Sequence, residues 1–296
     1  MTKILVTGVT GLIGKATVQH LLKKGVPANQ IMGLSRKKEG TEDLAAKGVE
    51  VRLGDYFDHD SLLRAFAGVD KIMLTSTVAF TDRFTQHYNA ITAARQAGVK
   101  QIVYMSVMRK EGSRRIMPEV TESDLFTEQV LKSSGLDYTI LYHPPFMDAL
   151  PFYYDSNPYE NGIKVPANNG KMAPATRDEL AEAHAEILST PGHENKTYSL
   201  GGSEAVSFAD IAKVLAEVKG QPVRFTTITA EEYIDLMVAP GFPRNVAEFI
   251  TSWAVAMEEG EFEHQSGDLE RLLGRKTKTF REYIESTLLE HTAGLQ

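Results

Sequence analysis

Near its amino terminus the chain has a short apolar run that ends at a glycine and leads directly into an amphipathic segment with two more glycines. This order predicts a strand, a tight turn and a helix. Gly8 permits the turn, Gly11 lets backbone N–H groups approach a pyrophosphate, and Gly14 lets the helix pack closely on the strand. The spacing Gly-x-x-Gly-x-x-Gly differs from the commonest dinucleotide fingerprint, and a turn that serves packing alone is the alternative.

The second expected strand indicates which dinucleotide this turn would bind. In such folds the residue at its end contacts the adenosine ribose: an acid for a free 2′-hydroxyl, often arginine for a 2′-phosphate. Here the strand is followed by Ser35-Arg36-Lys37-Lys38, with no acid. A cationic end favours NADP over NAD, although a solvated basic loop is the alternative. The expected cofactor residues of the first two strand ends are Gly8, Thr10, Gly11, Leu12, Ile13, Gly14, Ser35 and Arg36.

Composition limits the class of protein. A chain of 296 residues with 42% hydrophobic content can bury a substantial core, and a net charge of −7 argues against a nucleic-acid surface. The absence of cysteine excludes disulfides and thiolate metal sites. No apolar run approaches the ~18 residues of a membrane span, and the first strand leaves no room for a signal peptide. We expect a cytoplasmic protein with a small-molecule substrate, and leave a homodimer open.

Apolar runs alternate with helical periods through residues 1–145, which predicts an α/β fold, a doubly wound parallel sheet of the Rossmann type. Residues 146–296 are expected to form a smaller, mostly helical substrate lobe, irregular up to Pro166, with Lys196–Leu200 adding a strand back to the sheet. The expected strands are 30–34, 49–53, 71–75, 101–106 and 137–142. The expected helices are 41–47, 60–66, 83–97, 120–133, 177–188, 208–219, 230–237, 246–257 and 279–290.

Polar residues follow three further strands at the edge where ligands bind in this topology. Asp55 and Tyr56 follow the third strand, where a carboxylate can accept from an adenine amino group and a ring can flank the base. Small hydroxyl residues after the fourth and fifth strands would let a nicotinamide ribose lie close to the chain. Helix capping is the alternative for each, although Asp58 is better placed to cap the next helix. The expected residues here are Thr75, Ser76, Thr77, Met105 and Ser106.

The usual proton-transfer residues of short-chain reductases are absent. None of the eleven tyrosines has a lysine four residues later, so the Tyr-x-x-x-Lys pair is missing. Either the reaction needs no strong protein acid, or the protein senses a nucleotide without catalysis. The histidines show no paired metal-ligand spacing, so no metal is expected. His143, at the mouth of the expected crevice, is a weak catalytic candidate beside a packing role.

Aromatic residues of the second half could line a pocket for a flat substrate. Each of them could equally pack in the core. The candidates for substrate contact are Phe80, Phe146, Tyr153 and Trp253, with Phe152 and Tyr154 beside them.

Several motifs together give the chain a family resemblance. They are Thr7-Gly8-Val9-Thr10-Gly11, Ser35-Arg36, Gly54-Asp55-Tyr56, Gly98-Val99-Lys100, Thr127-Glu128, Ser134 to Thr139, Ala175-Thr176-Arg177 and His193 to Tyr198. With these the chain resembles the NmrA-like atypical short-chain reductases over nearly its whole length, and most of all the branch of triphenylmethane reductase and type 2 NAD(P)H:quinone oxidoreductase.

The resemblance implies NADPH-dependent two-electron reduction of a flat electrophile, such as a quinone or a triphenylmethane dye, by direct hydride transfer. It also implies cofactor contacts from Pro145, in the loop after Tyr142, and from Lys171. Some quinone-reducing relatives have lysine at Gln129, which makes that residue a second weak catalytic candidate, and arginine where this chain has Tyr142-His143. A non-catalytic redox sensor that binds NADP(H) is the alternative function.

Overall fold

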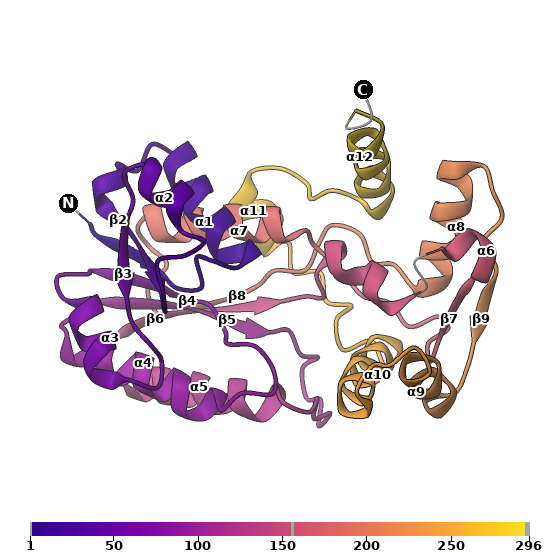
Figure 1. The fold of residues 1–296 in the computed structure, drawn as a ribbon, viewed down its shortest axis with the longest axis horizontal. Helices are drawn as coiled ribbons and strands as arrows, with labels where there is room; N and C mark the ends of the chain where they lie inside the picture. The colour runs from indigo at the N-terminus through magenta and orange to yellow at the C-terminus, as the bar shows by residue number, and fades with distance from the viewer. Residues whose placement is uncertain (1, 155–156, 294–296) are drawn as a thin grey trace. The chain divides into compact units, whose positions relative to one another are not determined.

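A computed structural model describes residues 2–154 and 157–293, with the side chains of 288–293 excepted. The chain divides into two compact units (Figure 1). The first unit comprises residues 1–107, 119–143 and 177–198, and the second comprises residues 108–118, 144–176 and 199–296. These bounds are discontinuous, so they differ from a single division after residue 145. The predicted division into a cofactor-binding domain up to residue 145 and a substrate lobe after it stays a prediction.

A seven-stranded sheet forms the centre of the first unit, in the order β3-β2-β1-β4-β5-β6-β8. Each neighbouring pair from β3 to β6 is parallel. The strand order reverses between β1 and β4, which is the topological switch point of a doubly wound sheet. The predicted Rossmann-type fold is therefore confirmed. The strands are β1 (Ile4–Val6), β2 (Ile31–Ser35), β3 (Glu50–Leu53), β4 (Lys71–Leu74), β5 (Gln101–Val107), β6 (Asp137–His143) and β8 (Lys196–Ser199).

Helices cover both faces of this sheet, as expected when parallel strands are buried on both sides. Figure 1 shows α1 (Leu12–Lys23) and α7 (Arg177–Ser189) on one face, and α3 (His59–Phe66), α4 (Arg83–Gln96) and α5 (Thr121–Ser133) on the other. Between β2 and β3 lies the short α2 (Glu42–Ala46). Asp58 caps α3 and Asp82 caps α4, each accepting a hydrogen bond from the backbone N–H of N3. The large buried side chains between sheet and helices include Phe66, Tyr104 and Leu131.

The helix after the first turn approaches β1 so closely that a side chain at Gly14 would not fit. A Cβ built at Gly14 would lie 2.4 Å from the carbonyl oxygen of Gly8 and 2.8 Å from that of Thr7. Gly8 itself has a φ of +64°, in the left-handed region that favours glycine. Gly11 N–H closes the turn by donating to the Gly8 carbonyl at 2.9 Å. Thus two of the three glycines are required by backbone geometry alone.

Polar side chains join α1 to α7. Thr17 Oγ1 donates to the carbonyl of Ile13 at 2.8 Å, so its oxygen accepts from Nδ1 of His184 at 3.2 Å. Nε2 of His184 then accepts from Nε2 of His143, 2.9 Å away at the end of β6. Burial keeps both imidazoles neutral and lowers the pKa of His184 to about 3. The sequence alone did not predict that α7 returns to the first unit.

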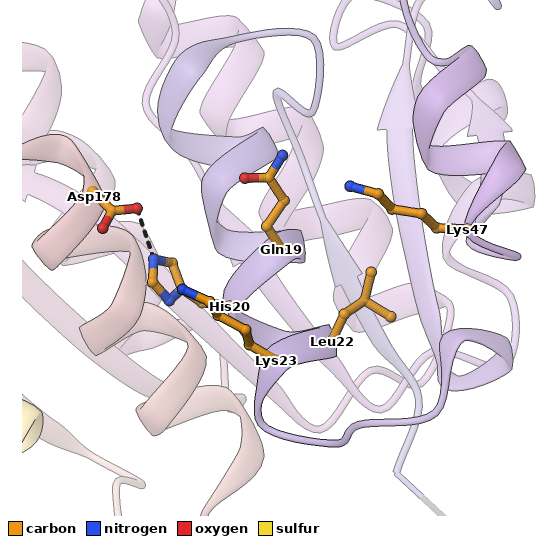
Figure 2. Close-up of a pocket in the computed structure, with 6 residues that line it drawn as sticks. All are labelled: Gln19, His20, Leu22, Lys23, Lys47 and Asp178. Atoms are coloured by element: carbon orange, nitrogen blue, oxygen red, sulfur yellow. Dashed lines mark hydrogen bonds and ion pairs between the residues drawn. The ribbon is translucent and has the colours of Figure 1, made fainter. Parts of the chain in front are cut away.

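The same helix pair borders a shallow depression of about 330 Å³. His20 on α1 is hydrogen-bonded through Nε2 to Oδ1 of Asp178 on α7, at 2.8 Å (Figure 2). Lys24, directly after the end of α1, pairs with Glu186 near the carboxyl-terminal end of α7. Polar contacts therefore extend along the α1–α7 interface on both sides of the buried His184. The lining of the depression consists of Gln19, His20, Leu22, Lys23, Lys47 and Asp178.

The second unit is mostly helical, as predicted, but it contains short elements that the sequence did not reveal. Two three-residue strands, β7 (Ile163–Val165) and β9 (Phe225–Thr227), pair in parallel within segments expected to be irregular or unassigned. Strands this short have too few residues for a recognisable alternation. The other elements are η2 (Met147–Tyr153), α6 (Pro158–Asn161), α8 (Phe208–Lys219), α9 (Ala230–Val238), α10 (Arg244–Glu258), α11 (Asp268–Leu273) and α12 (Phe280–Ala293).

Replacing Gly14 with alanine tests the close approach of α1 and β1. Alanine normally stabilises a helix interior by about 1 kcal/mol relative to glycine, but here its Cβ would meet backbone atoms that cannot move independently. We expect Gly14→Ala to lower the free energy of unfolding by about 1–3 kcal/mol, measured by urea denaturation. Gly11→Ala, whose Cβ would lie 3.3 Å from the Gly8 carbonyl, is the control with the smaller loss. Equal losses of unfolding free energy in the two variants would contradict a tighter contact at Gly14 than at Gly11.

The buried His184 predicts a pH dependence of stability. Because its folded pKa of about 3 lies below the ordinary value of 6.5, the unfolded chain binds a proton between these values that the folded chain does not. Stability therefore falls as pH decreases from 6.5, by about 1.4 kcal/mol per pH unit for this group. His184→Gln should reduce the slope of unfolding free energy against pH by that amount. The exposed His264→Gln is the control, and the same change in both variants would refute this role.

Candidate cofactor site

The amino-terminal end of α1 is open to an anion. Its cap residue, Gly11, offers no side-chain acceptor, and the first helical turn carries no acidic residue. Helix N-terminal N–H groups without intrahelical partners attract negative charge, and the helix dipole adds to this attraction. Gly8, Thr10, Gly11 and Leu12 are exposed, whereas Ile13 and Gly14 are buried. The exposed part of the turn can therefore receive a phosphate group, and the buried part fixes its position.

Cations stand beside this turn at the end of β2. Ser35 is buried, and Arg36, Lys37 and Lys38 after it are exposed. Within residues 2–154 and 157–293, no carboxylate lies within ion-pair distance of the Arg36 guanidinium. The nearby Asp43 on α2 pairs instead with Lys15 on α1 at 2.8 Å, which lowers the pKa of Asp43. The guanidinium is thus available to an anionic ligand.

The end of β3 carries the next two predicted residues. Oδ1 of Asp55 accepts from the backbone N–H of Phe57 at 2.9 Å, so this carboxylate stabilises a local turn. The predicted cap of α3, Asp58, accepts from Ser61 N–H at 3.0 Å. Tyr56 is half-buried against the core, and burial raises the pKa of its phenol. Asp55 remains half exposed beside the turn, so its predicted contact with adenine stays a prediction.

The ends of β4 and β5 are joined to β1 and to each other. Thr75 N–H donates to Oγ1 of Thr7 at 2.9 Å, and its hydroxyl donates back to the Thr7 carbonyl at 3.1 Å. The hydroxyl of Ser76 donates to the carbonyl of Met105 on the neighbouring strand. Ser106 donates to the buried carboxylate of Glu128 on α5 at 2.7 Å. The strand ends predicted to face the nicotinamide side are therefore held together by direct hydrogen bonds.

Thr77 is fixed by a buried network that the sequence analysis missed. Its backbone N–H donates to Nε2 of His87 at 3.1 Å, and its carbonyl accepts from Arg83 at 2.6 Å. Nδ1 of His87 donates to Thr127 at 2.9 Å, because the Thr127 hydroxyl donates elsewhere. This assigns a neutral imidazole, and burial with the Arg83 charge lowers the pKa of His87 to about 3. The signal in the sequence was polar residues four apart on helix faces that are otherwise apolar.

A buried ion pair completes that network. Arg83 and Asp124 are paired, with 5% and 1% of their surfaces exposed. Oδ1 of Asp124 also accepts from the Tyr104 hydroxyl at 2.7 Å, and Oδ2 accepts from Val107 N–H at 3.0 Å. An ion pair this deep persists only when its remaining hydrogen-bonding groups are also satisfied. Here the extra donors, Tyr104 and Val107, come from the middle and the end of β5, so the pair anchors α4 and α5 to that strand.

The two weak catalytic candidates lie in contrasting surroundings. His143 is buried in the chain of contacts to His184, which is the packing role left open by the sequence. Gln129 is exposed on α5, one residue after the buried Glu128. The Tyr142 hydroxyl donates to that carboxylate at 3.1 Å. Neither candidate has acquired a contact that assigns it a chemical role, and both remain predictions.

Of the expected substrate residues, Phe80 belongs to the first unit and has a φ of +64°, unusual for a bulky side chain. The others belong to the second unit. Phe146 forms a bridge with Ala175, and Trp253 stacks on Phe262 with ring centroids 5.4 Å apart. Tyr153 is half-buried. Trp253 thus makes the core contact that was its alternative role.

The two remaining cofactor candidates also lie in the second unit. Pro145 is buried, and Lys171 is exposed. Lys171 follows a turn in which the N–H groups of Asn168 and Gly170 donate to Oε2 of Glu258 at 2.6 and 2.8 Å. Glu258 on α10 therefore fixes the turn that carries this lysine.

In the described part of the chain, no three His, Cys, Asp or Glu side chains are grouped as metal ligands. The described helices include none with the length and apolar character needed to cross a bilayer.

Comparison with known proteins identifies the family of the chain. The model of the NmrA-like family matches residues 1–285. Quinone oxidoreductase 2 of Escherichia coli K12 is 33% identical over 284 residues, covering 95% of this chain and 97% of that protein. The structure of an NADPH-dependent quinone oxidoreductase of Escherichia coli complexed with NADPH has a TM-score of 0.91 at 31% identity, covering 96% and 99% of the two chains. Triphenylmethane reductase of Citrobacter sp. complexed with NADP(H) has a TM-score of 0.88 at 36% identity, covering 96% and 99%. The predicted resemblance is confirmed, and the chain belongs to the NmrA-like family.

Proposed function

We propose that this protein is an NADPH-dependent reductase that transfers a hydride to a flat electrophilic acceptor such as a quinone or a triphenylmethane-type dye. One observation carries the proposal. The exposed N-terminus of α1, which has no side-chain cap, follows β1, and unpaired cations follow β2, the strand next to β1 in the sheet. This is the arrangement that a diphosphate and a 2′-phosphate require. Relatives named as NADPH-dependent reductases of quinones and dyes support the same function.

In this proposal the first unit binds and orients the coenzyme. The turn from Gly8 to Gly14 holds the diphosphate, Arg36 holds the 2′-phosphate, and Asp55 with Tyr56 flanks the adenine. NADPH, when bound, supplies the hydride. The ends of β4 and β5, at Thr75, Ser76, Thr77, Met105 and Ser106, hold the nicotinamide side, assisted by Pro145 and Lys171. Their internal hydrogen bonds limit motion at these strand ends, so rate enhancement comes mainly from proximity and orientation.

A non-catalytic NADP(H) sensor is the second candidate function. Two observations favour it. The Tyr-x-x-x-Lys pair is missing, and His143 is buried, so its imidazole is not exposed to donate a proton to a substrate. Quinones and cationic dyes accept a hydride without a strong protein acid, so the same observation is compatible with catalysis. Turnover distinguishes the two functions.

Activity with a panel of acceptors is the direct test. We expect NADPH oxidation, followed at 340 nm, to be stimulated by at least one quinone or triarylmethane dye. The Gly14→Ala variant, which disturbs the diphosphate turn, should reduce that rate. Tight NADPH binding without turnover across a broad panel would instead support the sensor.

The role of Arg36 predicts a difference between the two nicotinamide coenzymes. Removing its charge-assisted hydrogen bonds in Arg36→Ala should weaken NADPH binding by about 1.5–3 kcal/mol, and NADH binding hardly at all. Dissociation constants for both coenzymes can be measured by titration calorimetry. Lys132→Ala, an exposed cation on α5, is the matched control. Equal losses for NADPH and NADH would refute the assignment.

A further inference from the structure

Phe80 has a backbone conformation that its residue type rarely takes. Its φ is +64°, in the left-handed region, where a bulky side chain is strained. Among the described residues, two other non-glycine residues have a positive φ, Glu119 and Asn195, and neither is aromatic. Ala79 and Phe80 form the centre of a turn, and turns normally have glycine or asparagine at a position with positive φ. The chain therefore keeps an aromatic ring where the backbone conformation favours glycine.

The loop that holds Phe80 joins the end of β4 to the start of α4, and hydrogen bonds fix it on both sides of this residue. The Arg83 guanidinium donates to the Thr77 carbonyl at 2.6 Å, and the Arg83 backbone N–H donates to the Thr81 carbonyl at 2.8 Å. Within the turn, the Thr81 hydroxyl donates to the Val78 carbonyl at 2.8 Å. These contacts determine the path of the loop, so they can maintain a strained φ at its centre.

Packing of the Phe80 ring within the chain offsets only part of this strain. Phe80 is 44% exposed and the nearby Val78 is 74% exposed, whereas Phe66 in the core of the same unit is 0% exposed. Stabilisation by burial increases with the apolar area removed from water, so a half-exposed ring contributes less than a core ring. Strained residues cluster at active sites and ligand clamps. Contact with a flat ligand would bury the remaining surface of the ring.

The loop lies at the edge of the sheet where the proposed function places the nicotinamide. It follows β4 directly, and the carboxyl ends of parallel strands form the ligand edge of a doubly wound sheet. Phe80 is three residues after Thr77, so the Cα atoms of these residues are at most about 11 Å apart. Both belong to the first unit, as do the expected nicotinamide contacts at the ends of β4 and β5. An acceptor that lies against the nicotinamide at this edge is therefore within reach of the Phe80 ring.

We propose that the Phe80 ring stacks on the flat acceptor and holds it against the nicotinamide, and that the fold retains the strained conformation for this contact. The inference rests on the proposed reductase function and adds to it a residue that determines acceptor preference. Stacking between aromatic rings requires a flat partner, and a larger partner buries more of the ring surface. The contact therefore contributes more to a fused-ring acceptor such as 1,4-naphthoquinone than to the single ring of 1,4-benzoquinone.

Steady-state kinetics with both quinones test this contact. We expect Phe80→Ala to lower kcat/KM for 1,4-naphthoquinone roughly five- to thirtyfold, because loss of an aromatic partner acts on this scale. The loss for 1,4-benzoquinone should be smaller. Phe80→Tyr, which keeps a ring of the same shape, should retain most of the rate, and NADPH binding should stay unchanged in both variants. A loss of NADPH affinity equal to the loss of kcat/KM would place the ring on the coenzyme and would overturn the proposal.

Phe84 is the matched control, because it is the same residue type with the same exposure of 44% but lies in α4 with a helical backbone. Phe84→Ala should leave kcat/KM unchanged for both quinones. Glycine variants test the strain, since glycine and alanine both remove the ring. Phe80→Gly should have a higher urea midpoint of unfolding than Phe80→Ala, and Phe84→Gly a lower one than Phe84→Ala. The same order of midpoints at both positions would show that Phe80 is unstrained and would overturn the proposal.

Binding to the oxidised complex separates this inference from the proposed function, because no hydride is transferred when NADP⁺ is bound. The probe is 1,4-naphthoquinone, titrated into protein saturated with NADP⁺. If Phe80→Ala weakens this binding but the unmodified protein shows no turnover with NADPH, the Phe80 contact holds and the reductase function fails. If Phe80→Ala and the unmodified protein reduce 1,4-naphthoquinone with equal kcat/KM, the reductase function holds and the Phe80 contact fails.

Discussion

The contact of α1 with the end of β1 is the constraint on which the rest of the site depends. At Gly14 there is no room for a Cβ atom, and at Gly8 the backbone takes a conformation that favours glycine. Because the helix begins so close to the strand, its unpaired N–H groups point to the carboxyl edge of the sheet, next to the switch point between β1 and β4. A side chain at Gly14 would separate helix and strand, and the helix N-terminus would no longer be placed to receive a phosphate.

The neighbouring strand ends are fixed in a different way, by buried side chains. Thr77 has its N–H and its carbonyl bound by His87 and Arg83, so both of its backbone polar groups are satisfied away from water. Burying a charged guanidinium and a carboxylate costs free energy that their attraction offsets only when every other polar group finds a partner. Asp124 meets this condition through Tyr104 and Val107. We infer that the network contributes more to the position of these strand ends than to stability.

The sequence predicted those parts of the fold that depend on residues close together in the chain, such as turns and helix caps. The glycine spacing gave the first turn, Asp58 was correctly assigned as a cap, and α8 has the predicted bounds because Ser207 and Gly220 mark its two ends. Of the parts that depend on contacts far apart in sequence, the return of residues 196–200 to the sheet was predicted and is confirmed by β8, but others were missed. The packing of α7 on α1 depends on His184 meeting Thr17, and the parallel pairing of β7 with β9 joins two three-residue segments. Neither has a periodic signal.

The candidate cofactor site follows the same rule. Diphosphate recognition uses backbone N–H groups and close glycine contacts, so its position could be predicted from spacing alone. The second unit contains a cavity of about 820 Å³, and its lining side chains, such as Phe152, Lys164 and Leu236, come from separate elements and formed no motif in the sequence. Substitutions can therefore change such a cavity one side chain at a time, while the first turn is limited by its backbone geometry at Gly8 and Gly14.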